Sequence, residues 1–240
     1  MIAIVTGASG GIGVGIVDVL TNAGWTVVGF DTRPFAGFSG AALIEVDVSD
    51  GTSVSAAVDR VTTGHGPPRA LVNNAAIGPL GTVLDTDEET FDQIMSVNAK
   101  GTFNASRSVL PTMIAEGGGS IINIGSGAGH GKANMAAYAA SKAAVHALTM
   151  SMSRDHFAAG VRVNTVIPGG GGIVSGISLE RFGGSPADYA SLPHKGSVAG
   201  RPVEPKDVGE TVAFLLSDAA ATISGTVIDL GCMAGQAGST

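Results

Sequence analysis

Short runs rich in Val, Ile and Leu alternate along the chain with longer segments of helical pattern. Seven runs are expected to form strands, at 2–6, 26–30, 42–46, 70–73, 120–125, 161–167 and 226–230. Helices are expected near 12–23, 52–62, 87–115, 137–159 and 205–217. Because the strand runs are apolar at successive positions, both faces of the sheet should be covered by helices. The repeated βαβ order predicts an α/β fold with a doubly wound parallel sheet of about seven strands.

The 240 residues suit one domain spanning 1–240, because this length can bury a sizeable core without a second domain. The segment 169–203 interrupts the alternation with many Gly, Ser and Pro residues and no clear strand. It follows the sixth expected strand, and open α/β sheets bind ligands beyond the carboxyl ends of their strands. We therefore expect a substrate loop at about 169–203, with a surface loop of no particular role as the alternative.

The composition favours an oligomer and excludes several classes of partner. Hydrophobic residues make up 44% of the chain and charged residues only 14%, so part of the surface is expected to be buried between subunits of a dimer or tetramer. A formal net charge of -7 argues against nucleic acid and anionic membranes as partners. The five histidines have no metal-ligand spacing, so no metal site is expected.

We expect neither export nor insertion into a membrane. It has a single cysteine, Cys232, and no apolar run of the roughly 18 residues that would span a bilayer. The start, "MIAIVTGASG", has no basic region before its glycines. We expect a cytoplasmic protein.

A glycine-rich turn, "TGASGGIG" at Thr6–Gly13, directly follows the first expected strand and opens a helix. Glycines there allow a tight turn and close approach of the backbone to a pyrophosphate, whose charge the helix N-terminus favours. The turn therefore predicts a Rossmann-type dinucleotide site. A plain strand-to-helix turn is the alternative.

Asp31 ends the second expected strand, about 20 residues further on, where a carboxylate can accept hydrogen bonds from ribose hydroxyls. The same carboxylate would repel a 2'-phosphate, and the glycine turn contains no Lys or Arg to bind one. Asp31 therefore favours NAD over NADP. Arg33 lies near enough to keep NADP open.

A phenol and an ammonium are paired in "YAASK", Tyr138 to Lys142. On a helix these positions lie on one face about 6 Å apart. A cation beside a tyrosine makes its proton easier to remove, which suits a general acid/base. Ser126, at the end of the fifth expected strand, can donate a hydrogen bond to a carbonyl oxygen during reduction. An amphipathic surface pair and a turn-forming serine are the alternatives.

Seven motifs in order resemble those of the classical short-chain dehydrogenases/reductases, and they extend over nearly the whole chain. They are "TGASGGIG", "VDVSD" (Val46–Asp50), "NNAA" (Asn73–Ala76), "VNAKG" (Val97–Gly101), "IINIGS" (Ile121–Ser126), "YAASK" and "VIPGG" (Val166–Gly170). Each motif alone is weak, whereas their joint order is specific.

The resemblance implies roles for individual residues. The catalytic tetrad would be Asn98, Ser126, Tyr138 and Lys142: the tyrosine as general acid/base, the serine on the substrate oxygen, the lysine on the nicotinamide ribose and the asparagine holding a water in a proton relay. Contacts to the cofactor are implied for Gly7, Ser9, Gly11, Ile12, Gly13, Asp31, Asp47, Val48, Asn73, Ala75, Tyr138, Lys142, Pro168, Gly169, Ile173 and Ser175.

The chain departs from the family pattern after the sixth expected strand. "PGGGGIVS", Pro168 to Ser175, has two additional glycines and places Ser175 where the family has a threonine. The ending "GTVIDLGCMAGQ" also differs from the common family ending. Both differences bear on the contacts at the substrate side of the site.

The predicted function is an NAD(H)-dependent oxidoreductase that interconverts a secondary alcohol and a ketone, with Tyr138 as general acid/base. Two alternatives remain: a 3-oxoacyl reductase that uses NADPH, and a non-catalytic nucleotide-binding protein on the same fold. The substrate loop contains apolar residues that predict a partly apolar small-molecule substrate, namely Ile177, Leu179, Phe182, Tyr189 and Leu192. The helical regions 87–115 and 137–159 are the expected subunit interfaces.

Overall fold

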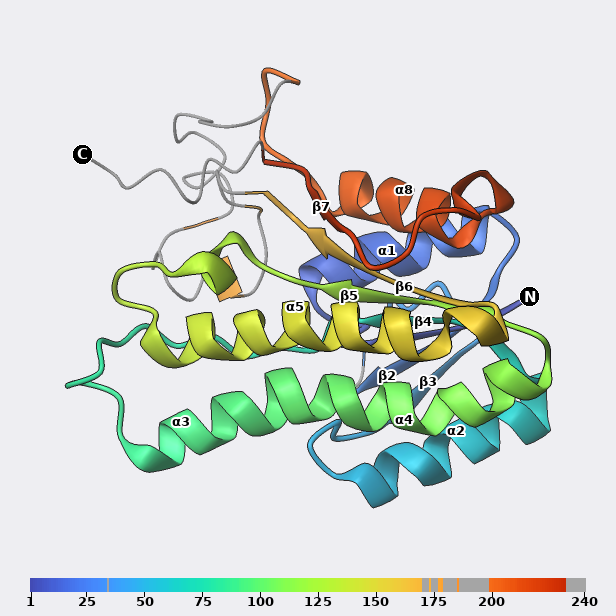
Figure 1. Cartoon of the computed structure of the whole chain (residues 1–240), viewed down its shortest axis with the longest axis horizontal. Helices are drawn as coiled ribbons and strands as arrows, with labels where there is room; N and C mark the ends of the chain where they lie inside the picture. Colours follow the sequence, from blue (N-terminus) through green and yellow to red (C-terminus); the bar gives the residue numbers. More distant parts are fainter. Residues whose placement is uncertain (34, 170–172, 174–176, 179–184, 186–198, 232–240) are drawn as a thin grey trace.

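The computed structural model describes residues 1–33, 35–169, 173, 177–178, 185 and 199–231 (Figure 1). It confirms the α/β fold, with a parallel sheet of seven strands in the order β3-β2-β1-β4-β5-β6-β7. The strands are β1 (Ile2–Thr6), β2 (Thr26–Asp31), β3 (Ala42–Glu45), β4 (Pro68–Asn73), β5 (Gly119–Ile124), β6 (Val161–Ile167) and β7 (Val227–Asp229).

Helices cover both faces of the sheet. They are α1 (Gly11–Asn22), α2 (Gly51–His65), α3 (Glu88–Met95), α4 (Gly101–Ala115), α5 (Ala136–His156) and α8 (Pro205–Leu216). Figure 1 shows α1 and α8 on one side of the sheet, with α2, α4 and α5 on the other. The chain is therefore doubly wound, as the repeated βαβ order predicts.

Each face of the sheet has its own core, because successive side chains of a strand point to opposite faces. In β1, Ala3 and Val5 pack with the apolar residues of α1 and α8. Ile4, between them, packs in a second cluster with α2, α4 and α5. Both clusters are buried, which explains why apolar residues occur at successive positions of the strands rather than at alternate ones only.

The strand order determines where along the sheet a ligand-binding crevice can form. The chain runs outward from β1 to β2 and β3, and then returns to β4 on the other side of β1. Loops leaving β1 and β4 therefore turn to opposite faces, which opens a crevice at the carboxyl ends of these two strands.

The helical region expected at 87–115 contains a change of helix type. Asp87 caps it by accepting a hydrogen bond from the Thr90 N–H, and α3 then runs into a π-helical segment, η1 (Ser96–Lys100), before α4 continues. A π-helical turn inserts an extra residue and rotates the side chains that follow, and such turns are frequent at functional sites. Asn98 lies inside it.

Candidate active site

A cavity of about 770 Å³ opens at the carboxyl ends of the central strands. Residues that end or follow five different strands line it: Gly7 after β1, Asp31 on β2, Asn74 after β4, Gly125 after β5 and Pro168 after β6. The cavity therefore lies at the crevice that the strand order creates.

The glycine-rich turn packs so closely that side chains do not fit there. Gly7 has a φ of 63°, and a Cβ on it would lie 2.8 Å from the Ala75 Cα. A Cβ on Gly13 would lie 2.1 Å from the Gly7 carbonyl oxygen. The cavity wall here is formed by Gly7, Gly11 and Ile12, with backbone groups at the start of α1 close to the surface.

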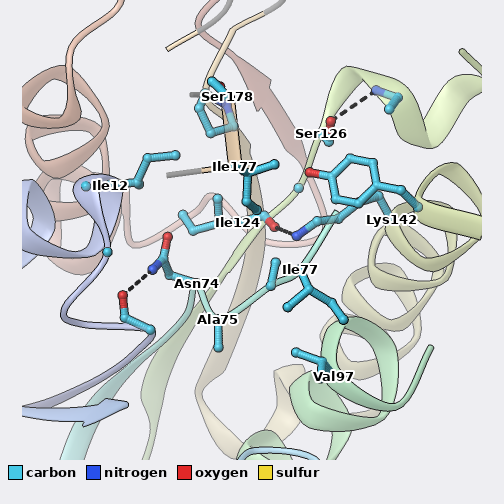
Figure 2. A pocket seen from close by; sticks show the side chains of 18 of the residues that line it. Ile12, Asn74, Ala75, Ile77, Val97, Ile124, Ser126, Lys142, Ile177 and Ser178 are labelled. Atoms are coloured by element: carbon cyan, nitrogen blue, oxygen red, sulfur yellow. Dashed lines mark hydrogen bonds between the residues drawn. The ribbon is translucent and has the colours of Figure 1, made fainter. Parts of the chain in front are cut away.

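Asn74 fixes this turn to the end of β4. Its Nδ2 donates to the carbonyl oxygens of Thr6 and Gly7, at 3.1 and 2.9 Å, and it lines the cavity (Figure 2). The motif "NNAA" had implied the neighbouring Asn73 instead. The Asn73 side chain points into the interior, where its Nδ2 donates to Ser106 Oγ and Asn123 Oδ1 and where it does not line the cavity.

Asp31 is held in the cavity wall by backbone donors. Its Oδ2 accepts a hydrogen bond from the Ser9 N–H at 2.9 Å, and its Oδ1 accepts one from the Arg33 N–H at 3.0 Å. The Asp31 carboxylate is only 6% exposed, whereas the Arg33 side chain, with Nε 3.8 Å from Oδ1, is 71% exposed. Ser9 thus acts on the wall through Asp31 and does not itself line the cavity.

Asp47 and Val48 lie at the same end of the cavity as Asp31. The Asp47 Oδ1 accepts hydrogen bonds from both the N–H and the hydroxyl of Ser49, at 2.9 and 2.7 Å. The Val48 carbonyl accepts from Asn104 Nδ2 at 2.9 Å, which ties this loop to α4.

Tyr138 and Lys142 lie one turn apart on α5, and both line the cavity. Both are buried, and the Lys142 Nζ lies 5.9 Å from the centre of the Tyr138 ring. The Lys142 Nζ also donates to the Ile124 carbonyl oxygen at 2.8 Å, which joins α5 to the end of β5 (Figure 2). Ser126 lines the cavity just beyond that strand, and its Oγ accepts a hydrogen bond from the Ala128 N–H at 3.2 Å.

Asn98 supports the site from behind the cavity wall. Its side chain is buried and makes two hydrogen bonds to the backbone of Ile77, which lines the cavity. Its Nδ2 also donates to Ser141 Oγ at 3.0 Å, and that hydroxyl donates to the Tyr138 carbonyl oxygen at 2.8 Å. Asn98 therefore links η1 to the Ile77 segment and to α5.

His146 is a buried residue packed beside the site, and no sequence motif pointed to it. It follows Lys142 by one turn on α5 and lies under the loop that carries Ser126, where a Cβ on Gly125 would be 2.6 Å from its Nε2 and a Cβ on Gly129 would be 2.9 Å from its Cε1. Burial, followed by the charges of His130 and Lys142, lowers the pKa of His146 to about 4. Tyr138, Lys142 and His146 are spaced four residues apart, so a helix places all three on one face. This spacing could have pointed to His146 from the sequence.

The remaining predicted contacts lie around the end of β6. Pro168, Gly169 and Ile173 line the cavity, and Ser175 lies outside the described residues. A Cβ on Gly169 would lie 3.1 Å from a side-chain carbon of Val203, and Ile173 forms a β-bridge with Val203. Gly13 and Asn98 do not line the cavity.

Several lining residues come from loops that carried no motif. They are Ile77, Leu80, Lys132, Met135, Ile177 and Ser178. Gly81 and Met135 form an isolated β-bridge, which brings the loop after β4 against the segment before α5.

No group of three or more His, Cys, Asp or Glu residues among those that the structure describes could hold a metal ion. No helix in the described part of the chain is both long enough and apolar enough to cross a membrane.

The chain is similar in sequence to known oxidoreductases. A family model described as enoyl-(acyl carrier protein) reductase matches residues 7–232. The chain is 37% identical over 235 residues to 2-(S)-hydroxypropyl-CoM dehydrogenase 3 of Xanthobacter autotrophicus, covering 92% of this chain and 91% of that protein.

Two solved structures are similar throughout. Aldohexose dehydrogenase of Thermoplasma acidophilum, in ligand-free form, has a TM-score of 0.88 and 31% identity, with 96% of this chain and 93% of that chain covered. The 3-ketoacyl-(acyl-carrier-protein) reductase of Brucella melitensis, complexed with NADH, has a TM-score of 0.86 and 27% identity, with 98% of both chains covered.

Proposed function

Because the chain belongs to the short-chain dehydrogenase/reductase family of oxidoreductases, we propose that it is an NAD(H)-dependent enzyme that interconverts a secondary alcohol and a ketone. The observation that carries the proposal is that Ser126, Tyr138 and Lys142 line one cavity whose other end contains the Asp31 carboxylate. A dinucleotide site and an acid/base pair thus share one space.

The residues of the cavity fit a dinucleotide. Side chains are excluded at Gly7 and Gly13, so a pyrophosphate could approach the backbone at the start of α1. The Asp31 carboxylate would accept hydrogen bonds from the adenosine ribose hydroxyls, and its negative charge would oppose a 2'-phosphate. Val46 and Val48 would flank the adenine. Asp31 therefore supports NAD as the preferred cofactor, and the Brucella relative is described in complex with NADH.

The chain's own residues would then handle the proton and the developing charge. A bound nicotinamide supplies or accepts the hydride. Tyr138 would donate its phenolic proton to the ketone oxygen during reduction, and would accept the hydroxyl proton during oxidation. Ser126 would donate a hydrogen bond to the same oxygen. The ammonium of Lys142, held by the Ile124 carbonyl, would stabilise negative charge on the phenolic oxygen.

Replacing Tyr138 tests this assignment. Tyr138→Phe removes only the hydroxyl, so NADH should bind within about threefold of wild type while ketone reduction falls about 10²- to 10⁴-fold, the usual contribution of a general acid. Titration calorimetry with NADH and absorbance of the reduced cofactor measure the two quantities. Near-normal turnover in this variant would refute the mechanism.

A screen of secondary alcohols and ketones, with NAD⁺ and NADP⁺ side by side in the oxidative direction, separates the alternatives. Preference for NADP(H) together with reduction of 3-oxoacyl thioesters would identify a 3-oxoacyl reductase. Tight binding of NADH without turnover of any member of the panel would identify a nucleotide-binding protein instead.

The enzyme is further proposed to be a homo-oligomer, a dimer or a tetramer, that uses α4 and α5 as subunit contacts. Large apolar side chains are exposed on these helices and just after them: Phe103, Ile114, Met150 and Phe157. Light scattering coupled to size-exclusion chromatography measures the assembly, and a strictly monomeric protein would contradict this assignment.

A further inference from the structure

One charged side chain in the cavity wall, that of Lys132, has no partner in the part of the chain that the structure describes. Lys132 lines the cavity together with Ser126, Ala128, Met135 and Tyr138. It lies on the segment between the short 3-10 helix Gly127–His130 and α5, and its side chain is exposed. Among the residues that the structure describes, it takes part in neither an ion pair nor a hydrogen bond.

The other charged residues of the wall have partners. Asp31 is bonded to Ser9 and Arg33, and the Asp47 carboxylate accepts from Ser49. The Lys142 ammonium donates to the Ile124 carbonyl. These contacts fix each of those charges within the fold, whereas the charge of Lys132 is available to a ligand.

The segment that carries Lys132 is anchored on both sides. The Gly131 N–H donates to the Ala128 carbonyl at 2.9 Å, with Gly131 at a φ of 98°. Beyond Lys132, the Gly81 N–H donates to the Asn134 carbonyl at 3.0 Å, and the Ala136 N–H donates to the Gly81 carbonyl at 3.1 Å. Because the backbone is already placed, only the side-chain rotamers of Lys132 have to be ordered when it meets a ligand.

The surroundings of Lys132 define the chemistry of that ligand. Met135 lies three residues from Lys132, and its β-bridge with Gly81 brings Leu80 beside this segment. Ile173 and Ile177 add further apolar lining to the same cavity. A cation beside such walls suits a small molecule with an apolar body and one acidic group. The Tyr138 and Ser126 side chains mark the reacting end of the molecule.

We propose that Lys132 is a specificity-determining residue that binds an anionic group, a carboxylate or a sulfonate, at the end of the substrate remote from its alcohol or ketone carbon. The inference rests on the proposed oxidoreductase function and names its substrate class: small hydroxy acids and keto acids. It involves recognition alone, so the hydride and proton transfers are unchanged.

The test compares keto carboxylates and keto sulfonates with neutral methyl esters of the keto carboxylates, in ketone reduction with NADH. Lys132→Met keeps the length and apolar stem of the side chain and removes the charge. We expect it to lower kcat/KM about tenfold for the anions, mainly through KM, and to leave the esters within about twofold. Lys132→Arg should keep the preference for anions. Lys206→Met, a charge removal on the exposed side of α8, is the matched control.

Ionic strength supplies an independent readout. Raising salt from about 0.05 to about 0.5 M should weaken the preference of the wild type for anions, because charge attraction at an exposed cation is screened. The preference of Lys132→Met should not change with salt.

Two results would overturn the assignment of Lys132. The first is a higher kcat/KM of the wild type for the esters than for the anions. The second is a Lys132→Met variant whose kcat/KM falls equally for anions and esters. If the wild type reduces no ketone at all, the proposed function fails instead. Calorimetric binding of a hydroxy acid to the protein with NADH then decides anion recognition, since unchanged affinity in Lys132→Met would contradict it.

Discussion

Asn98 and Ile77 are joined by a pair of hydrogen bonds, in which the Asn98 Oδ1 accepts from the Ile77 N–H at 2.9 Å and the Asn98 Nδ2 donates to the Ile77 carbonyl at 2.8 Å. Ile77 lines the cavity, and the third bond of Asn98 reaches α5 through Ser141. One buried amide thus holds together two walls of the site.

Asn98→Ala should therefore damage both stability and turnover. It removes both hydrogen bonds to the half-buried backbone groups of Ile77, at a cost of about 1 to 3 kcal/mol of the free energy of unfolding, and it lets the Ile77 segment move away from Tyr138. We expect kcat to fall at least about tenfold. Urea unfolding and steady-state kinetics measure the two effects.

Asn164 provides the matched control for that variant. Its Nδ2 donates to the Ile223 carbonyl at 2.9 Å, and its Oδ1 accepts from the Thr226 N–H at 3.2 Å, away from the cavity. Asn164→Ala should lose similar stability and keep kcat within about threefold. Equal losses of kcat in the two variants would show that Asn98 acts through stability alone.

Gly13→Ala and Gly64→Ala should change the free energy of unfolding in opposite directions. At Gly13 the new Cβ would lie 2.1 Å from the Gly7 carbonyl oxygen, so the turn must shift, and we expect lower stability and at least about tenfold weaker binding of NADH. Gly64 lies in α2 with nothing within 4 Å, so alanine there should stabilise by about 0.5 to 1 kcal/mol. Thermal unfolding with and without NADH measures both; a harmless Gly13→Ala would contradict the close packing of this turn.

The charge of Asp31 should control the choice of cofactor. Asp31→Asn keeps an acceptor for a backbone N–H and removes the negative charge, so the ratio of kcat/KM for NAD⁺ to that for NADP⁺ should fall about tenfold, equivalent to about 1.4 kcal/mol. Asp50→Asn makes the same charge change at the start of α2, outside the cavity, and should leave the ratio unchanged. A ratio that Asp31→Asn does not move would remove the basis for assigning NAD.

His146 should make the free energy of unfolding depend on pH. Its pKa is lowered from 6.5 to about 4 in the folded state, so the unfolded chain binds more protons between these values. The free energy of unfolding therefore falls as the pH drops from about 6.5 towards 4. Between pH 7.5 and pH 5 the contribution is about 1 to 2 kcal/mol, allowing for solvent screening.

His146→Gln, which does not titrate, should lose this part of the pH dependence. His65→Gln, at an exposed histidine near the end of α2, should keep it. Urea unfolding at the two pH values measures the difference. An unchanged slope in His146→Gln would mean that other groups cause the acid sensitivity.

The sheet was predictable because its signal is local. Four consecutive apolar residues in "IAIVT" are typical of a strand covered on both faces, so the run indicates both a strand and a place inside the sheet. The alternation with helices then requires parallel pairing through crossovers of one hand, which leaves few topologies.

The site was less predictable because it depends on orientation and on loops. Asn73 and Asn74 are adjacent in sequence and point to opposite sides at the end of β4, which a motif cannot distinguish. The π-helical turn around Asn98 is only five residues long, so it produces no periodic pattern of apolar residues from which it could be predicted. Met135 forms a β-bridge with Gly81, a contact between segments far apart in the chain, and Lys132 lines the cavity from the same segment as Met135.

Ile173 forms a β-bridge with Val203, and a Cβ on Gly169 would lie 3.1 Å from a side-chain carbon of Val203, so the chain returns beside the end of β6 before α8 begins. The closure entropy of the span between Gly169 and Val203 grows only slowly, by about 0.6 kcal/mol for each doubling of its length. Changes in the length of this span should therefore cost the sheet little free energy of unfolding. If the span contacts the substrate, as the sequence predicts, its residues can change with the substrate while the sheet keeps its fold.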